Sequence, residues 1–233
     1  RVMLRRRREE VIPELPTKTH REHRVSIERA DVWELLEQAY AALEEQLAAQ
    51  GIDLAAAIQM ADAVNLDRAL SIDLIARARQ ALATAKLPAL LQLVEVYEEA
   101  REPVVVFSAH RSPVDALASR EGWAAITGSV PAAERTRLVQ DFQEGRLAGL
   151  AGTIQAAGVG LTLTRAHHAV FADLSWTPAD NQQAEDRVCR IGQTRGVVIT
   201  RLVADHVLDQ RVTRLLARKQ ELIEQSVEAA ARR

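Results

Sequence analysis

The sequence predicts an α/β fold, built on a parallel sheet with helices on both faces and preceded by a helical segment. A β-branched run at residues 104–107 is bounded by proline and polar residues, as in a strand buried on both faces. Strand-like and helix-like segments then alternate to the end of the chain, which implies right-handed crossover connections. Residues 29–101, by contrast, show helical spacing almost throughout. Together these observations predict helices first and a helix-covered sheet after them.

The chain of 233 residues divides into three predicted parts. Residues 1–28 are polar, carry an arginine run and are interrupted by prolines, so we expect a linker. Residues 29–101 are expected to form a helical insertion or packing segment, in which Gly51 marks a break. Its expected helices are 31–50, 71–85 and 87–101. Residues 102–233 are expected to form one α/β lobe that ends in a helix.

Local patterns place the elements of this lobe. The expected strands are 104–107, 123–126, 147–152, 168–172 and 197–203. The expected helices are 113–120, 131–144, 178–191 and a last one that Asp205 caps. Gly145 and Gly192 follow two of these helices directly, as helix-ending glycines do, and Pro178 fits a first helical position.

Composition bounds the possible functions. The single Cys189 cannot form an internal disulfide, which fits a reducing compartment, and the absence of an 18-residue apolar run argues against a membrane partner. A net charge of −2 and an aromatic content of 3% argue against a general single-strand binder, so any nucleic-acid contact must be local. The N-terminus lacks a signal-peptide pattern. Because the chain begins Arg1-Val2-Met3, we expect a fragment of a longer protein.

Residues 175–193 carry the strongest chemical signal. A narrow apolar stripe that could anchor the predicted helix consists of Ala184, Val188 and Ile191. A second stripe, about 100° around the helix, consists of Gln183, Arg187 and Arg190. Such a helix would aim two guanidiniums rigidly at an anionic ligand. The alternative is that Asp186, four residues before Arg190, forms a surface ion pair worth ~0.3–0.5 kcal/mol.

Three loops of small residues are expected beyond the carboxyl ends of the strands, where ligands gather in parallel sheets. These loops are residues 108–111, 127–129 and 153–160. Hydroxyls and exposed backbone N–H groups suit phosphate oxygens. Each loop is also an ordinary turn sequence, so none of them predicts a ligand on its own.

The sequence lacks the motifs of a self-sufficient enzyme. It contains no phosphate loop of the G-x-x-x-x-G-K-[ST] type, no acidic strand-end motif for Mg²⁺ and no nucleophile elbow. His167 and His168 are adjacent on an expected strand, so they should point to opposite faces, and no metal site is predicted from them.

Residues 183–193, QAEDRVCRIGQ, resemble the last conserved helicase motif of the Swi/Snf-type DNA translocases of helicase superfamily two. Supporting matches lie at 104–110, 128–142, 153–162 and 176–178, with Lys86 where the family often has a lysine before its second lobe. The residue pattern of 153–162 and 183–188 is most similar to the annealing-helicase, or HARP-like, branch. The resemblance covers residues 1 to about 225 and thins over 29–70.

The resemblance implies a second RecA-like lobe that works with an N-terminal RecA-like lobe of the same protein. The first lobe would carry the phosphate loop and the carboxylates for Mg²⁺, and the chain alone would not hydrolyse ATP. Arg187 and Arg190 would act as arginine fingers toward the γ-phosphate of ATP. The implied nucleotide-binding residues are Gln183, Gly158, Gly160 and Thr162.

The resemblance also implies double-stranded or forked DNA as a partner, held through its phosphate backbone. The implied DNA-contacting residues are Ser108, Gly128, Ser129, Thr153, Gln155 and Trp176. Gln155 stands where many relatives have arginine. The implied function is the C-terminal lobe of an ATP-dependent double-stranded DNA translocase or remodeller. A non-catalytic DNA- or partner-binding remnant of such a motor is the alternative, and a strand-separating helicase is disfavoured because the stretch shows no wedge element.

Overall fold

The structure, a computed structural model, describes residues 15–27, 30–49, 51, 69–157, 160–206, 209–210, 212–214 and 216–221. Within these residues six strands form one sheet in the order β1-β6-β5-β2-β4-β3. The strands are β1 (Lys18–Val25), β2 (Val104–Ser108), β3 (Trp123–Ile126), β4 (Gly149–Thr153), β5 (His168–Phe171) and β6 (Val197–Ala204). All neighbouring strands are parallel, which confirms the predicted sheet.

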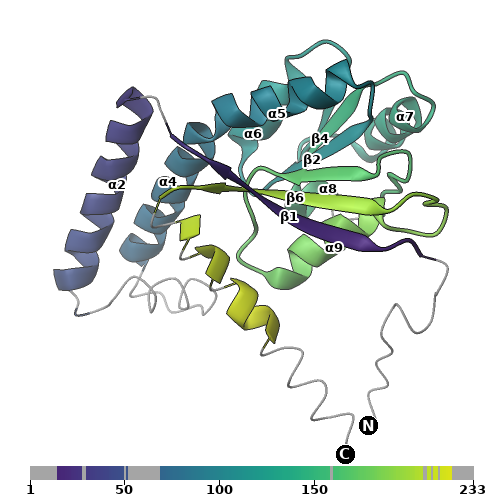
Figure 1. Cartoon of the computed structure of the whole chain (residues 1–233). Coiled ribbons are helices and arrows are strands. Elements are labelled where there is room, and N and C mark those ends of the chain that lie inside the picture. Colours follow the sequence, from purple (N-terminus) through teal and green to yellow (C-terminus); the bar gives the residue numbers. More distant parts are fainter. Residues whose placement is uncertain are drawn as a thin grey trace, which may run out of the picture.

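Helices flank the sheet on both sides. The helical segment before β2 contains α2 (Ala30–Ala49), α4 (Ala69–Ala85) and α5 (Leu87–Glu99). The crossovers contain α6 (Arg111–Ala118), α7 (Ala132–Gln143), α8 (Ile154–Ala157) and α9 (Pro178–Val188). In the view of Figure 1, α5 and α6 lie above β1 and β6, and α9 lies below them. The prediction of a parallel sheet with helices on both faces, preceded by a helical segment, is therefore confirmed.

The central strand β2 explains why the sheet sits where it does. All five of its residues are buried, as the β-branched run predicted. The rings of Phe107 on β2 and Phe171 on β5 lie 5.2 Å apart and pack between the two strands. The core thus forms around β2, β4 and β5, and the ends of these strands are held rigidly relative to one another.

Strand β1 was not predicted. The polar, proline-bearing residues 1–28 predict a linker, but Lys18–Val25 pairs with β6 along its full length, from Lys18 opposite Val197 to Val25 opposite Ala204. Its pattern is almost entirely exposed, with only Val25 buried. An edge strand with charged side chains resists pairing with other chains, and the same charges hide it from a search for apolar alternation. The boundary placed after residue 28 stays a prediction.

Strand β4 contains two glycines because its neighbours approach closely. The indole ring of Trp123 on β3 lies where any Cβ on Gly149 would be placed, and a Cβ on Gly152 would come within 2.9 Å of the Ala157 methyl. The glycines that weakened the predicted strand are therefore what allow β3 and α8 to pack against it.

A buried lysine fixes the chain beyond β6. Lys86, between α4 and α5, is 1% exposed, and its ammonium donates to the carbonyl oxygen of Leu202 at 3.2 Å and to Asp209 at 3.3 Å. Asp209 also accepts a hydrogen bond from the backbone N–H of Ala204 at 2.7 Å. The described residues from 209 to 221 are helical, as expected for the last helix. None of the described helices combines the length and the apolar character that a bilayer crossing requires.

Candidate functional site

The helix predicted to carry both arginines is shorter than expected. Helix α9 begins at Pro178, as predicted, but it ends at Val188, and Cys189 leaves helical geometry with φ −89° and ψ 83°. Ala184 and Val188 are fully buried, so the anchoring part of the stripe is confirmed. Ile191 is 71% exposed, so its predicted anchoring role is wrong. Gly192, at φ 99°, supports the turn that has already left the helix.

The two arginines are brought together with the small-residue loop that follows α8. Arg190 donates through Nη1 to the carbonyl oxygen of Leu161 at 3.1 Å. The carbonyl oxygen of Arg187 accepts a hydrogen bond from the N–H of Leu163 at 2.9 Å. Both arginines are half-buried. A turn that leaves the helix, rather than a second helical stripe, thus places Arg190 beside this loop.

The residues predicted to bind nucleotide lie along the same loop and helix. Gly160 has a positive φ of 69°, with open space where a side chain would extend, and Thr162 is half-buried. Gln183 is exposed on α9. Gly158 lies outside the described residues. We call Gln183, Arg187, Arg190, Gly160 and Thr162 the arginine group.

The structure shows Asp186 paired with Lys18, rather than with Arg190 as the alternative prediction had it. Asp186 accepts from the ammonium of Lys18 on β1 at 2.7 Å and from the side-chain amide of Gln182 at 3.2 Å. The hydrogen bond of Arg190 shown within the described chain goes instead to Leu161. A guanidinium has five N–H donors, so this bond leaves donors of Arg190 for an anion.

Glu185 ties α9 to the sheet. It is 1% exposed, and its carboxylate lies 3.1 Å from His20 Nε2 on β1 and accepts from Arg201 Nη2 on β6, also at 3.1 Å, with Lys18 at 3.5 Å. Burial raises the pKa of Glu185, but the hydrogen bond from His20 and the charges of His20, Lys18 and Arg201 outweigh it and lower the pKa. The sequence did not predict this cluster, because Lys18 and His20 lie in a polar stretch expected to be a linker and Arg201 is a single arginine in an expected strand.

Gln193 holds the chain between Arg190 and β6. Its side-chain N–H groups donate to the carbonyl oxygens of Thr164 at 3.0 Å and Ala166 at 2.7 Å. Its carbonyl oxygen accepts from the backbone N–H groups of Thr194 and Arg195, both at 3.0 Å. One buried amide therefore fixes the segment that carries Arg190 against the loop that precedes β5.

The predicted DNA-contacting residues form a second group at the carboxyl ends of the strands. Ser108 ends β2 and lies opposite Thr153, which ends β4. Thr153 is half-buried, and Gln155, at the start of the next helix, is exposed. Gly128 and Ser129 are exposed in the turn after β3. We call Ser108, Gly128, Ser129, Thr153, Gln155 and Trp176 the strand-end group.

Ser108 is the most enclosed member of the strand-end group. It is 0% exposed, and its hydroxyl oxygen lies 2.7 Å from the carboxylate of Asp173 after β5 and 2.6 Å from the carbonyl oxygen of His110. Asp173 also accepts from the backbone N–H of Ala109 at 2.7 Å. Burial, foremost, lowers the pKa of His110, partly opposed by the charge of Asp173. Ser108 and Asp173 therefore shape the loop at residues 109–110.

Arg135 fixes the turn after β3 through hydrogen bonds. Arg135 on α7 donates to three carbonyl oxygens of the turn, those of Thr127, Gly128 and Val130, at 2.8–3.2 Å. The Ser129 hydroxyl is hydrogen-bonded to that of Thr127 at 2.9 Å. With its carbonyls turned toward Arg135, the turn is rigid while Gly128 and Ser129 stay exposed.

Trp176 packs against Arg79, a residue that was not among the predicted site residues. The guanidinium of Arg79 on α4 lies 4.1 Å from the centroid of the Trp176 ring and donates to the carbonyl oxygen of Leu174. Burial lowers the pKa of Arg79, opposed by the charges of Asp173 and Asp209. The sequence offered one signal for this role: Arg79 lies among apolar residues of a predicted helix, close to Ala78, Ala81 and Leu82. The structure shows that all of these residues are buried. Helix α4, predicted to contribute packing only, thus supports the strand-end group.

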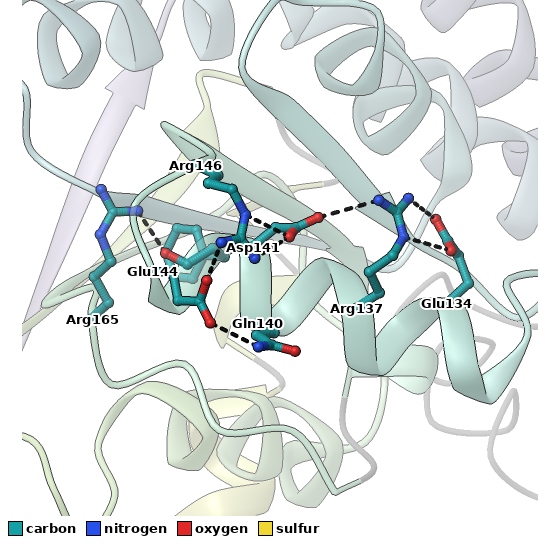
Figure 2. A network of polar contacts seen from close by, with 8 residues as sticks. Glu134, Arg137, Gln140, Asp141, Glu144, Arg146 and Arg165 are labelled. Carbon is teal, nitrogen blue, oxygen red and sulfur yellow. Dashed lines mark hydrogen bonds and ion pairs between the residues drawn. The ribbon is translucent and has the colours of Figure 1, made fainter.

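The charged surface of α7 is compensated internally. Figure 2 shows Arg137 between Glu134 and Asp141, and Arg146 between Asp141 and Glu144. Because each arginine is shared by two carboxylates, this face of α7 is not a positive patch. Exposed pairs of this kind are screened by solvent and contribute little to stability.

The prediction that His167 and His168 point to opposite faces is wrong. Their ring centroids lie 4.0 Å apart. Strand β5 begins only at His168, so His167 precedes the strand and the alternation of side chains does not apply to the pair. Glu102, which comes just before β2, lies 3.6 Å from His167.

Part of the chain matches a known domain family. Residues 85–192 match the helicase conserved C-terminal domain. The DNA annealing helicase and endonuclease ZRANB3 of Mus musculus is 45% identical over 123 residues, which are 49% of this chain and 11% of that protein. The chain thus spans a small part of the length of this curated relative.

Solved structures agree with the fold. The C-terminal part of the Fun30 ATPase domain superposes with a TM-score of 0.65 at 17% identity, over 87% of this chain and 90% of that one. The Sulfolobus solfataricus SWI2/SNF2 ATPase core in complex with dsDNA superposes with a TM-score of 0.62 at 20% identity, over 87% of this chain and 45% of that one. The predicted resemblance to Swi/Snf-type helicases, with an annealing helicase among the relatives, is confirmed. Residues 85–192 thus match a helicase conserved C-terminal domain, and the chain is similar in sequence to an annealing helicase and in fold to SWI2/SNF2 ATPase domains.

Proposed function

We propose that this chain is the second lobe of an ATP-dependent double-stranded DNA translocase or remodeller. The observation that carries the proposal is the hydrogen bond from the Arg190 guanidinium to the carbonyl oxygen of Leu161, together with the backbone hydrogen bond from Leu163 to Arg187, which bring the segment bearing both arginines against a loop of small residues. The similarity to Swi/Snf-type helicases supports an anionic ligand at this place.

In this proposal Arg187 and Arg190 are arginine fingers. Such fingers stabilise the charge that develops on a phosphoryl group during transfer and are worth 10³–10⁵ in rate, or about 4–7 kcal/mol. A surface ion pair would contribute only ~0.3–0.5 kcal/mol, and the acid proposed for that pair is bonded to Lys18 instead. Because transition-state stabilisation is the larger of the two effects, we assign Arg187 and Arg190 to the finger role.

The remaining members of the arginine group, with Gly158, would contact the nucleotide. ATP supplies the phosphoryl group whose transfer to water drives the motor. The residues present fit its charge, because two guanidiniums and the N–H-bearing loop at 160–162 favour phosphate oxygens. We propose that the ligands of the accompanying Mg²⁺ belong to an N-terminal RecA-like lobe, and that the present chain by itself does not hydrolyse ATP.

The strand-end group would contact the phosphate backbone of double-stranded or forked DNA. Gly128, Ser129 and Gln155 are exposed at the edge of the sheet, as direct contacts would need. Ser108 is buried and bonded to Asp173, so we propose that it acts through the loop at 109–110. The Sulfolobus SWI2/SNF2 ATPase core has been solved in complex with dsDNA, which supports the same partner here. Contacts of this kind follow a strand without selecting its sequence.

The alternative is a non-catalytic remnant that binds DNA or a partner. The arginine group favours the motor over this alternative, because the Arg190 guanidinium keeps N–H donors beyond its hydrogen bond to Leu161, beside a loop of small residues.

The test is ATP hydrolysis by the complete polypeptide with duplex, forked and single-stranded DNA. We expect duplex or forked DNA to stimulate hydrolysis, and Arg190→Ala to reduce the stimulated rate by about 10³-fold or more. DNA binding by Arg190→Ala should stay within a few-fold of the wild type, since the residue is not in the strand-end group. The matched control is Arg137→Ala, which removes an exposed arginine of the α7 network and should leave the rate unchanged. Hydrolysis by Arg190→Ala at the wild-type rate would refute the finger assignment, and no hydrolysis with any of the three DNAs would favour the remnant.

A further inference from the structure

The amino-terminal edge of the sheet gathers three potential metal ligands, at the opposite end of the strands from the strand-end group. One nitrogen from each of His167 and His168 and one carboxylate oxygen of Glu102 all lie within 4.8 Å of one another. No other set of this kind is found among the described residues. This cluster takes no part in the proposed function.

Backbone register fixes the cluster. His168 is the residue opposite Val104 in the pairing of β5 with β2, and Glu102 lies two residues before Val104. The N–H of Glu102 is bonded to the carbonyl oxygen of Tyr97 at 2.9 Å, and the ring of Tyr97 packs 4.8 Å from that of His168. The three ligands are therefore presented by rigid elements, as a metal site requires.

The two imidazoles have unmet hydrogen-bonding capacity. Within the described part of the chain, neither His167 Nδ1 nor His168 Nδ1 has a hydrogen-bond partner, although both atoms are buried. His167 is only 6% exposed. Buried polar atoms without partners are uncommon and costly, and a bound ion is one of the explanations for them.

We propose that Glu102, His167 and His168 form a binding site for a divalent transition-metal ion of the imidazole-preferring class, with Zn²⁺ as its representative. Two histidines and one carboxylate suit Zn²⁺ and its neighbours in the series, whereas Mg²⁺ prefers oxygen ligands. Ligand atoms around tetrahedral Zn²⁺ stand about 3.3 Å apart, so small rotations of the side chains complete the site. Bound there, the ion links the start of β5 to the segment that leads into β2.

The ion pair between Arg195 and Glu102 provides a test of the site. Arg195 lies 3.3 Å from Glu102, and its side chain is 60% exposed. Its positive charge competes with a metal for the same carboxylate. Removing it should strengthen metal binding, whereas removing a structural ion pair would weaken any site that depended on that pair.

The experiment titrates the untagged chain, first freed of metal with a chelator, with Zn²⁺ by calorimetry. We expect one ion per chain with micromolar affinity, no response to Mg²⁺, and a rise in thermal midpoint of about 5–10 °C at a hundredfold excess over Kd. Glu102→Gln and His168→Ala should each weaken binding tenfold or more, and Arg195→Ala should tighten it. His23→Ala, which removes an exposed histidine of β1, is the control and should bind like the wild type.

Glu102→Gln keeps the shape of a partly exposed side chain, so it tests the site even if His168→Ala does not fold. Absence of Zn²⁺ binding at 100-micromolar concentrations, or equal affinity in the wild type and Glu102→Gln, would overturn the proposal.

Discussion

At the scale of single residues, the buried carboxylate of Glu185 shows how the arginine helix is oriented. Two strands that are far apart in sequence send polar partners to it, Lys18 and His20 from β1 and Arg201 from β6. An isolated carboxylate at 1% exposure would be strongly unfavourable, so this cluster makes its burial possible. Glu185 is two residues before Arg187, and the cluster therefore sets the rotation of α9 relative to the sheet.

We predict that Glu185→Gln lowers the free energy of unfolding by about 2–3 kcal/mol near pH 7, because it removes charge-assisted hydrogen bonds from a buried cluster. The measurement is denaturant unfolding, with Glu134→Gln, an exposed α7 acid, as a control that leaves the free energy of unfolding unchanged within error. Because the folded-state pKa of Glu185 is lowered, its contribution is fully present above the ordinary value of 4.5 and is lost as the pH falls through the folded pKa. The stability difference between wild type and Glu185→Gln should therefore shrink below pH 4.5. A difference that stays constant down to about pH 2 would contradict the assigned charge state.

At the scale of elements, β4 depends on the absence of side chains. It passes under the indole of Trp123 at Gly149, and propensities alone would not have predicted that two glycines strengthen the sheet there. Packing between strands outweighs the intrinsic weakness of glycine in a strand.

Gly149→Ala should consequently destabilise the fold by about 1–3 kcal/mol, since its Cβ would overlap the Trp123 ring. For a chain of this size that lowers the thermal midpoint by about 2–4 °C per kcal/mol. Gly128→Ala is the matched control: no atom lies within 4 Å of its added Cβ, so the midpoint should move by no more than about 2 °C. Equal midpoints for the two variants would show that β3 can shift to accept the methyl group.

At the scale of the whole molecule, the sequence predicted the parallel sheet, most strand positions and the resemblance to Swi/Snf-type helicases. These follow from apolar runs, turn residues and a long motif, all of which are local. It did not predict β1, because an edge strand rich in charge carries no alternation, nor the end of α9, because Ile191 fits the helical spacing yet lies in solvent. The roles of Arg79, Glu185 and Glu102 depend on contacts across the fold, with Leu174, His20 and His167 respectively, and no local pattern encodes them.

The central claim is that Arg187 and Arg190 face a nucleotide bound between this lobe and an N-terminal one. Its most direct test is a structure of the complete polypeptide with duplex DNA, ADP and aluminium fluoride, a mimic of the transferred phosphoryl group. We predict that a guanidinium nitrogen of Arg190 lies about 3 Å from the fluoride ligands, with Arg187 beside it. A complex in which Arg190 stays bonded only to Leu161 and the nucleotide faces another edge of the lobe would contradict the account.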